Sequence, residues 1–310
     1  MTGRAWAAFA ALSVIWGFPY FFIKVALNDL SPACIVWGRV TLAALVLVPL
    51  AWQRGALRGV WSRIGAVSAF ATAEIIAPFL LIAIGERWIS SSLTAILMAT
   101  VPLVVVVLAR WFVPAERPSF RRLTGLGIGL AGVLALLGVD VAGRPLEVLG
   151  ASCVLVATIG YAVGPLVAQR YLVGLDPLGP AAVSLSMSAA ALTIPAALTM
   201  PSQIPSPTAL GSVAVLGLAC TALALVLFLF LISEAGASRA AVITYLNPAI
   251  AVLLGVSVLG EHLGGGSIAG LFMILLGSWL ATARDATSNA VRSASIERPR
   301  FDAGPERRSR

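Results

Sequence analysis

A chain of 310 residues in which 59% are hydrophobic and only 11% are charged is not an ordinary water-soluble protein, because soluble domains carry about 25% charged residues. The mean hydropathy of +0.98 predicts an all-α integral membrane protein instead. The net charge of +8 does not indicate a nucleic-acid partner, since the basic residues are spread over predicted loops and a C-terminal tail, and a bilayer with anionic headgroups is the simpler partner.

Ten predominantly apolar runs follow one another along the chain, each near the length of about 20 residues that an α-helix needs to cross a bilayer. They cover approximately residues 5–26, 32–51, 64–84, 92–112, 123–139, 148–168, 178–199, 209–232, 240–259 and 267–283. The first run is counted as a span and not as a signal peptide, because no convincing cleavage site follows a short apolar core. The basic residues concentrate in loops that place both termini in the cytoplasm, and residues 284–310 are predicted to form a disordered basic cytoplasmic tail.

The second half of the chain repeats the first. Pro19 matches Pro165, which lies 146 positions later, and Glu116 matches Glu261, which lies 145 positions later. Because each copy contains five spans, an odd number, the second copy enters the membrane from the opposite side. Such inverted repeats are typical of secondary transporters, in which two similar units open a central site to alternate sides of the membrane. We therefore predict ten transmembrane helices in two inverted five-helix repeats, residues 1–140 and 147–283.

Sequence motifs in both halves carry a resemblance to a known family. The first half has "IWG" in the first run and "SSSLTAILMATVPL" in the fourth, and the second half has "ASRAAVITYLNPAIAVLLGVSVLGE" followed by "GLFMILLGSWL". In these stretches the chain resembles the EamA family of the drug/metabolite transporter superfamily. The resemblance implies ten helices, a location in the bacterial inner membrane and movement of small metabolites, often out of the cell, without a particular substrate.

Glu74 lies near the middle of the third run, and no other Asp or Glu lies near the middle of a predicted span. A charge at the bilayer centre costs about 2.5–3.5 kcal/mol on insertion scales, so the side chain should face protein or water, pair with a cation or hold a proton. Two functional roles remain open, namely binding a cationic or amino group and carrying a coupling proton. The structural alternative is a neutral Glu74 hydrogen-bonded to a neighbouring helix.

Arg39, in the second run, is the second candidate. Its guanidinium could contact a substrate carboxylate or pair with Glu74, and a side chain of this length can also extend to the membrane interface. Lys24, near the outer end of the first run, is expected to be an interfacial anchor.

Prolines at equivalent places in the two halves predict interrupted helices, because proline removes a backbone donor and frees a carbonyl group. They are Pro19, Pro102, Pro165 and Pro248. In transporters such interruptions point to the binding region, and kinking for packing is the alternative. Further candidate contacts are polar or aromatic side chains near these prolines, namely Trp16, Tyr20, Trp37, Tyr161, Tyr245 and Asn247.

No metal or cofactor site is expected. The single histidine, His262, lies in a predicted loop, and the three cysteines lie in separate apolar runs, so no ligand set comes together. Glu116 and Glu261 each precede a predicted helix, whose positive N-terminal end favours a carboxylate, and this indicates a structural role.

These features predict a secondary active transporter that moves a small polar metabolite, an amino acid or related compound, by alternating access. Export is the expected direction, and proton coupling through Glu74 is an open option. The alternative is a membrane-embedded lipid-modifying enzyme, but that chemistry needs clustered acid, base, nucleophile or metal ligands, which the runs do not supply. Small-residue faces in runs 123–139 and 267–283 permit a homodimer.

Overall fold

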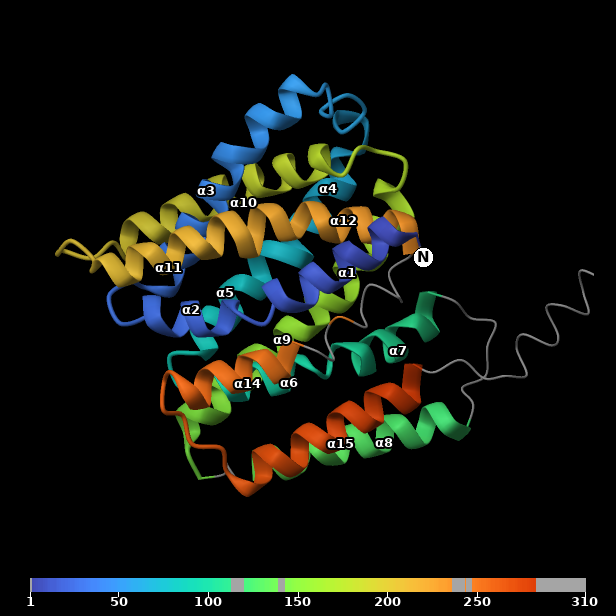
Figure 1. The fold of residues 1–310 in the computed structure, drawn as a ribbon, viewed down its shortest axis with the longest axis vertical. Coiled ribbons are helices and arrows are strands. Elements are labelled where there is room, and N and C mark those ends of the chain that lie inside the picture. The colour runs from blue at the N-terminus through green and yellow to red at the C-terminus, as the bar shows by residue number, and fades with distance from the viewer. Residues whose placement is uncertain (1, 113–119, 139–142, 236–242, 244–246, 283–310) are drawn as a thin grey trace, which may run out of the picture.

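A computed structural model describes residues 2–112, 120–138, 143–235, 243 and 247–282 of the chain. Within these residues the regular structure is helical throughout, with no strand (Figure 1). Seven helical stretches are long and apolar enough to cross a membrane, and they are Gly3–Ala26, Pro32–Gln53, Trp61–Gly85, Ser91–Leu108, Pro145–Leu172, Leu178–Leu198 and Pro207–Ala235. Asn247–Ser257 and Gly265–Ala281 are shorter apolar helices. The all-helical membrane class is therefore confirmed, whereas the count of ten crossings stays a prediction.

The first half of the chain contains α1 (Gly3–Ile15), α2 (Pro19–Ala26), α3 (Pro32–Gln53), a short 3-10 turn (Trp61–Arg63), α4 (Ile64–Phe70), the π-helical segment η2 (Ala71–Ile76), α5 (Ala77–Gly85), α6 (Ser91–Met98), α7 (Val101–Phe112) and α8 (Phe120–Leu136). Serine side chains define several helix starts. Ser31 Oγ accepts from the Cys34 amide at 3.2 Å at the start of α3, and Ser90 Oγ accepts from the Leu93 amide at 3.0 Å at the start of α6. These caps satisfy amide groups that have no partner within the helix.

The second half contains α9 (Pro145–Val167), the π-helical segment η4 (Ala168–Leu172), α10 (Leu178–Leu198), α11 (Pro207–Gly217), the π-helical segment η5 (Leu218–Leu223), α12 (Ala224–Ala235), α14 (Asn247–Ser257) and α15 (Gly265–Thr282). Helices of the two halves pack against each other in pairs, and the main pairs are α3 with α10, α5 with α9, α11 with α2, α14 with α6, α1 with α12, and α8 with α15. The core therefore lies between the two halves.

The predicted proline interruptions are seen at some positions and not at others. The first span is broken between Ile15 and Pro19, and the fourth is broken between Met98 and Val101, next to Pro102. Pro248 is the second residue of α14, where its missing N–H leaves no helical hydrogen bond unmade. Pro165, by contrast, lies inside the continuous helix α9, so the predicted break is absent there. The helix accommodates Pro165 and then continues as the π-helical turns of η4.

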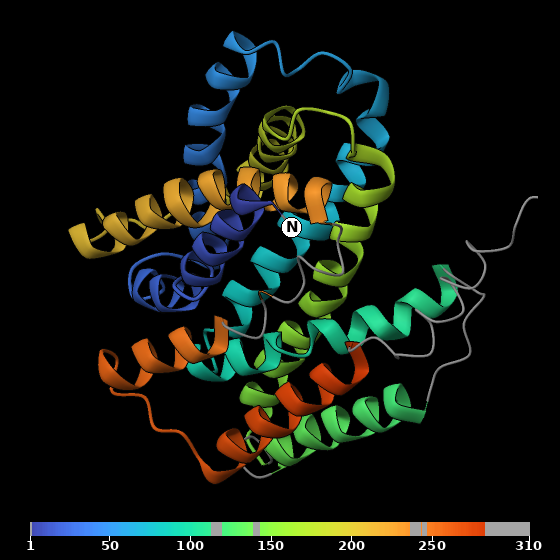
Figure 2. The same cartoon turned by 45° about the vertical axis from the view of Figure 1, so that its right-hand side comes forward.

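Glycines bring α8 and α15 into backbone contact. A Cβ added at Gly125 would lie 2.6 Å from the Gly277 carbonyl oxygen, and one added at Gly277 would lie 2.4 Å from the Gly129 nitrogen. Figures 1 and 2 both show α8 (green) and α15 (red) side by side. The small-residue faces that permit a homodimer in the sequence are therefore occupied within a single chain.

Glu261 links the two halves at the start of α6. Its Oε1 accepts from the Ser91 amide at 2.8 Å and the Ser91 hydroxyl at 2.9 Å, while its Oε2 accepts from the Ser92 amide at 2.9 Å and the Ser92 hydroxyl. The expectation that Glu261 serves the helix that follows it is corrected, because the carboxylate instead caps the N-terminus of α6. We call this contact the Glu261 latch. Glu116, its sequence equivalent, lies outside the described residues.

The latch predicts a pH dependence of stability. Burial alone would raise the pKa of Glu261, but the hydrogen bonds from Ser92 and Ser91 outweigh it and hold the pKa below the ordinary value of 4.5. Because the folded-state pKa is depressed, this stabilisation is present above the ordinary value and is lost as the pH falls through the folded-state pKa. Glu261→Gln is expected to cost about 1–2 kcal/mol near neutral pH, since the side chain is partly exposed.

Thermal unfolding of wild type and Glu261→Gln over a pH series tests this expectation. The difference between the two proteins should shrink on acidification. Glu147→Gln, which removes a carboxylate from the exposed Arg144–Glu147 pair, is the matched control. A constant difference at all pH values would show that the ionised form of Glu261 does not supply the stabilisation.

Candidate functional site

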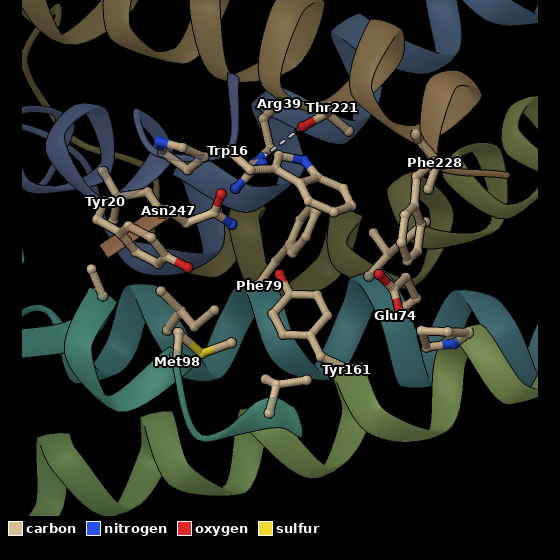
Figure 3. Close-up of a pocket in the computed structure, with 18 of the residues that line it drawn as sticks. Trp16, Tyr20, Arg39, Glu74, Phe79, Met98, Tyr161, Thr221, Phe228 and Asn247 are labelled. Carbon is tan, nitrogen blue, oxygen red and sulfur yellow. Dashed lines mark hydrogen bonds between the residues drawn. The ribbon is translucent and has the colours of Figure 1, made fainter. Parts of the chain in front are cut away.

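A cavity lies between the two halves of the chain, at the level where several helices change geometry. Its volume is ≈ 100 Å³, counted as the space open to the centres of water molecules, whereas about 10–15 Å³ suffices for one water. The walls come from α2, α3, η2, α5, α6, α7, α9, η5, α12 and α14. Six of the eight predicted substrate-binding or coupling residues line it, and they are Trp16, Tyr20, Arg39, Glu74, Tyr161 and Asn247. Figure 3 shows their side chains.

Arg39 enters the cavity from α3 and is only 3% exposed. Its Nε donates to the Thr221 hydroxyl at 2.9 Å, and its guanidinium carbon lies 3.9 Å from the centre of the Phe79 ring (Figure 3). The charge is thus positioned by a polar contact on one side and a cation–π contact on the other. Arg39 makes these contacts in place of the ion pair with Glu74, or the extension to the membrane interface, that the sequence left open.

Glu74 enters the cavity from η2 and is 4% exposed. Its Oε2 is buried and has no hydrogen-bond partner in the part of the chain that the structure describes. A Cβ added at Gly164 of α9 would lie 2.1 Å from this oxygen, so a glycine is needed at that position for the carboxyl group to fit. The alternative of a Glu74 side chain satisfied by a neighbouring helix does not apply to this oxygen among the described residues.

Glu74 and Thr221, the hydrogen-bond partner of Arg39, both lie on π-helical segments. Glu74 lies in η2, and Thr221, which holds Arg39, lies in η5 at the corresponding place in the second half. The Thr221 hydroxyl donates to the Leu216 carbonyl at 2.7 Å, a donor–acceptor spacing of five residues. A π-helical turn redirects side chains and interrupts the α-helical pattern of backbone hydrogen bonds. Such turns are frequent at functional sites.

Aromatic side chains form much of the remaining wall. Trp16 packs edge-on against Phe228 with ring centres 4.8 Å apart, and Tyr161 of α9 faces them from the opposite side (Figure 3). Asn247 begins α14, and its amide nitrogen donates to the carbonyl oxygens of Ile243 and Ser13 at 3.1 Å each when the amide is oriented toward them. The cavity therefore combines a buried cation, a buried acid and aromatic faces.

Other predicted residues lie elsewhere. Trp37 is on α3, but its indole nitrogen donates to the Thr193 hydroxyl of α10 at 3.2 Å, away from the cavity lining. Pro19 and Pro165 belong to the lining, whereas Pro102 and Pro248 are buried outside it. Tyr245 lies outside the described residues.

Several lining residues escaped prediction. Phe79, Met98, Thr221 and Phe228 line the cavity beside the predicted side chains. The hydroxyl of Thr221 in a strongly apolar run was an available signal, but threonine is common in membrane helices. The apolar residues carried no signal that separates a cavity wall from a lipid-facing surface.

Trp37 provides a test of which predicted aromatic side chains belong to the functional wall of the cavity. Trp37→Phe removes a hydrogen bond worth about 0.5–1.5 kcal/mol in stability and is expected to leave substrate affinity and transport rate unchanged. Trp16→Phe, by contrast, alters the cavity wall and is expected to weaken substrate binding. Uptake kinetics of the two variants, corrected for protein amount, distinguish these outcomes. A weaker effect for Trp16→Phe than for Trp37→Phe would contradict the assignment of the lining.

The fold and cavity define a helical, multi-pass membrane protein with an internal cavity. The chain belongs to the EamA-like transporter family, whose model matches residues 3–138 and again residues 148–283. The resemblance expected from the sequence motifs is thereby confirmed, and the protein is a membrane transporter.

Relatives match over nearly the whole chain. The inner membrane transporter YedA of Escherichia coli strain K12, described as uncharacterized, is 27% identical over 94% of this chain and 96% of its own length. An uncharacterized transporter of Archaeoglobus fulgidus is 24% identical over 89% of this chain and 98% of its own length. A solved crystal structure superimposes with a TM-score of 0.66 and 17% identity, covering 96% of this chain and 100% of its own, which shows a shared fold.

Proposed function

We propose that this protein is a secondary active transporter of the bacterial inner membrane that exports a small zwitterionic metabolite, an amino acid or a related compound. The observation that carries the proposal is the pair of buried charged side chains, Arg39 and Glu74, in the wall of one cavity. Arg39 suits a carboxylate, because a guanidinium offers several N–H donors in one plane. Glu74, with a buried oxygen that lacks a partner among the described residues, suits an amino group.

The aromatic side chains and the size of the cavity restrict the class of substrate further. Trp16, Tyr161 and Phe228 offer apolar surface beside the charged groups, so a compact side chain can be buried while the polar ends are bound. The name of the Escherichia coli relative supports the inner-membrane location.

Alternating access between two inverted five-helix repeats is the proposed mechanism. Support comes from the two separate stretches that match the family model, residues 3–138 and 148–283. Further support comes from the packing pairs. If the spans of one half are exchanged for those of the other, α1 with α12 becomes α9 with α5, and the pairs α3 with α10 and α8 with α15 are unchanged. In this proposal both termini lie in the cytoplasm.

Transport by the purified full-length protein in proteoliposomes tests the proposal. Vesicles preloaded with an unlabelled L-amino acid should take up the same radiolabelled amino acid by exchange, for at least one member of a panel of all the common amino acids. Protein-free vesicles are the control for leakage. Wild-type vesicles that exchange none of the panel, with the protein correctly folded, would overturn the proposed substrate class.

A further inference from the structure

A second buried acid, Glu86, lies beyond one end of the cavity. Its relative exposure is 0%, and it follows directly on the last residue of α5. Glu86 comes twelve residues after Glu74 on the same helical stretch, a separation of about 18 Å along a helix. Ile82, one turn before Glu86, belongs to the cavity wall, whereas Glu86 itself does not. The two acids therefore occupy different environments.

Both carboxyl oxygens of Glu86 are buried without a hydrogen-bond partner in the described part of the chain. Thr94 faces Glu86 from α6, but the Thr94 hydroxyl donates its single proton to the Ser90 carbonyl at 3.0 Å. A hydroxyl oxygen can still accept a hydrogen bond, so a protonated Glu86 has an acceptor beside it. An unsatisfied buried carboxylate is costly, and a proton removes that cost.

The nearest cation is already engaged elsewhere. Lys24 donates through Nζ to the carbonyl oxygens of Glu86 and Ile89, at 2.7 and 2.8 Å, and so caps the C-terminal end of α5. Lys24 and Glu261 exert the strongest electrostatic influences on Glu86 and act in opposite directions, with Arg39 weaker, and Tyr20 is the other titratable group nearby.

We propose that Glu86 is the site of the coupling proton, separate from the substrate site at Glu74, and that its occupancy controls the Glu261 latch. This inference rests on the proposed transport function. With the proton bound, Glu86 is neutral and the latch between Glu261 and Ser91–Ser92 closes. Loss of the proton to water leaves a carboxylate that repels Glu261 and attracts Lys24 away from the Glu86 and Ile89 carbonyl oxygens. The Glu261 latch then opens. A proton from water that reaches Glu86 through the opened contact neutralises the carboxylate again.

A proton suits this site better than a metal cation. Glu86 is fully enclosed, and the described residues contain no group of three or more His, Cys, Asp or Glu side chains that could hold a metal ion. Infrared spectroscopy of the full-length protein in lipid nanodiscs tests occupancy directly. Wild type is expected to show the carbonyl stretch of a protonated carboxyl group that disappears in Glu86→Gln. Identical spectra for the two proteins would overturn the assignment.

Transport tests the coupling. The probe is the L-amino acid that wild type exchanges fastest in the panel. Glu86→Gln is expected to retain exchange but to lose accumulation driven by a pH gradient, whereas Glu74→Gln slows both processes. Accumulation by Glu86→Gln that still follows the pH gradient, or wild-type accumulation that follows a sodium gradient instead, would overturn the proposal.

Two further measurements distinguish failure of the proton site from failure of the proposed transport function. Thr94→Val preserves the acid but removes the hydroxyl beside it, and it should shift the pH dependence of accumulation, which provides a readout if Glu86→Gln does not fold. No shift in Thr94→Val would contradict the proposed proton position. Wild-type vesicles without any exchange would refute the proposed function, while the infrared comparison would still decide whether Glu86 holds a proton.

Discussion

Replacing Glu74 with glutamine is expected to lower the rate of amino-acid exchange in proteoliposomes by roughly 10- to 100-fold, because hydrogen bonds to a charged group contribute about 1.5–3 kcal/mol. Glutamine keeps the shape of the side chain but cannot form a charge-assisted contact with a substrate amino group. The carboxyl group is held inside the cavity wall by η2 and faces Gly164 of α9, so no other described acid lies in the lining to replace it.

Gly164→Ala tests the same site without changing the acid. The added methyl group would meet the Glu74 Oε2 and displace the carboxyl group, so transport should fall as it does in Glu74→Gln. Glu147→Gln, in the Arg144–Glu147 surface pair, is the control and should transport like wild type. Undiminished exchange by well-folded Glu74→Gln would remove Glu74 from the substrate site.

Gly125→Ala is expected to destabilise the protein by about 1–3 kcal/mol, because its methyl group cannot enter the interface between α8 and α15 without moving the backbone. The new Cβ would lie 2.6 Å from both the Ala281 nitrogen and the Gly277 carbonyl oxygen. Since these atoms belong to the main chain of α15, a change of side-chain rotamer does not relieve the clash. The backbones of the two helices must therefore move apart at this contact.

Gly127→Ala is the matched control on the same helix. A Cβ at Gly127 meets nothing within 4 Å, and alanine is favoured over glycine in a helix by about 0.8–1 kcal/mol. The two substitutions should therefore change the thermal unfolding midpoint in opposite directions in the same detergent. Equal shifts would mean that α8 and α15 do not approach through Gly125.

The two buried acids, Glu74 and Glu86, differ in how well the sequence predicts their burial. Glu74 was recognisable because an acid in the middle of an apolar run is costly unless it has a role. Glu86 follows the end of a run, where a carboxylate is ordinarily solvated, so its complete burial could not be predicted. Its surroundings include Thr94 of the next helix together with Lys24 and Glu261, which come from distant parts of the chain. The same distance explains why the capping of α6 by Glu261 was not foreseen.

Arg39 and Trp37 show a second limit. Both lie on α3, yet Arg39 enters the cavity and Trp37 contacts Thr193, while Leu45 on the same helix is 66% exposed. In a soluble helix the polar face would reveal the orientation. Membrane helices are apolar on nearly all sides, so the residue pattern does not separate a lipid-facing side from a protein-facing side.

Hydropathy and the internal repeat therefore determined, from the sequence by itself, that this protein is a helical membrane transporter with an acid, Glu74, in the middle of a span, because lipid requires long apolar helices whose backbone groups are satisfied internally. Only the tertiary structure decided which faces of those helices surround the cavity, which π-helical turns direct Glu74 and Thr221 into it, and which acid is closed off at Glu86. The reason is that helix rotation depends on close packing between distant segments, such as the glycine contacts of α8 and α15, and a single run does not encode it.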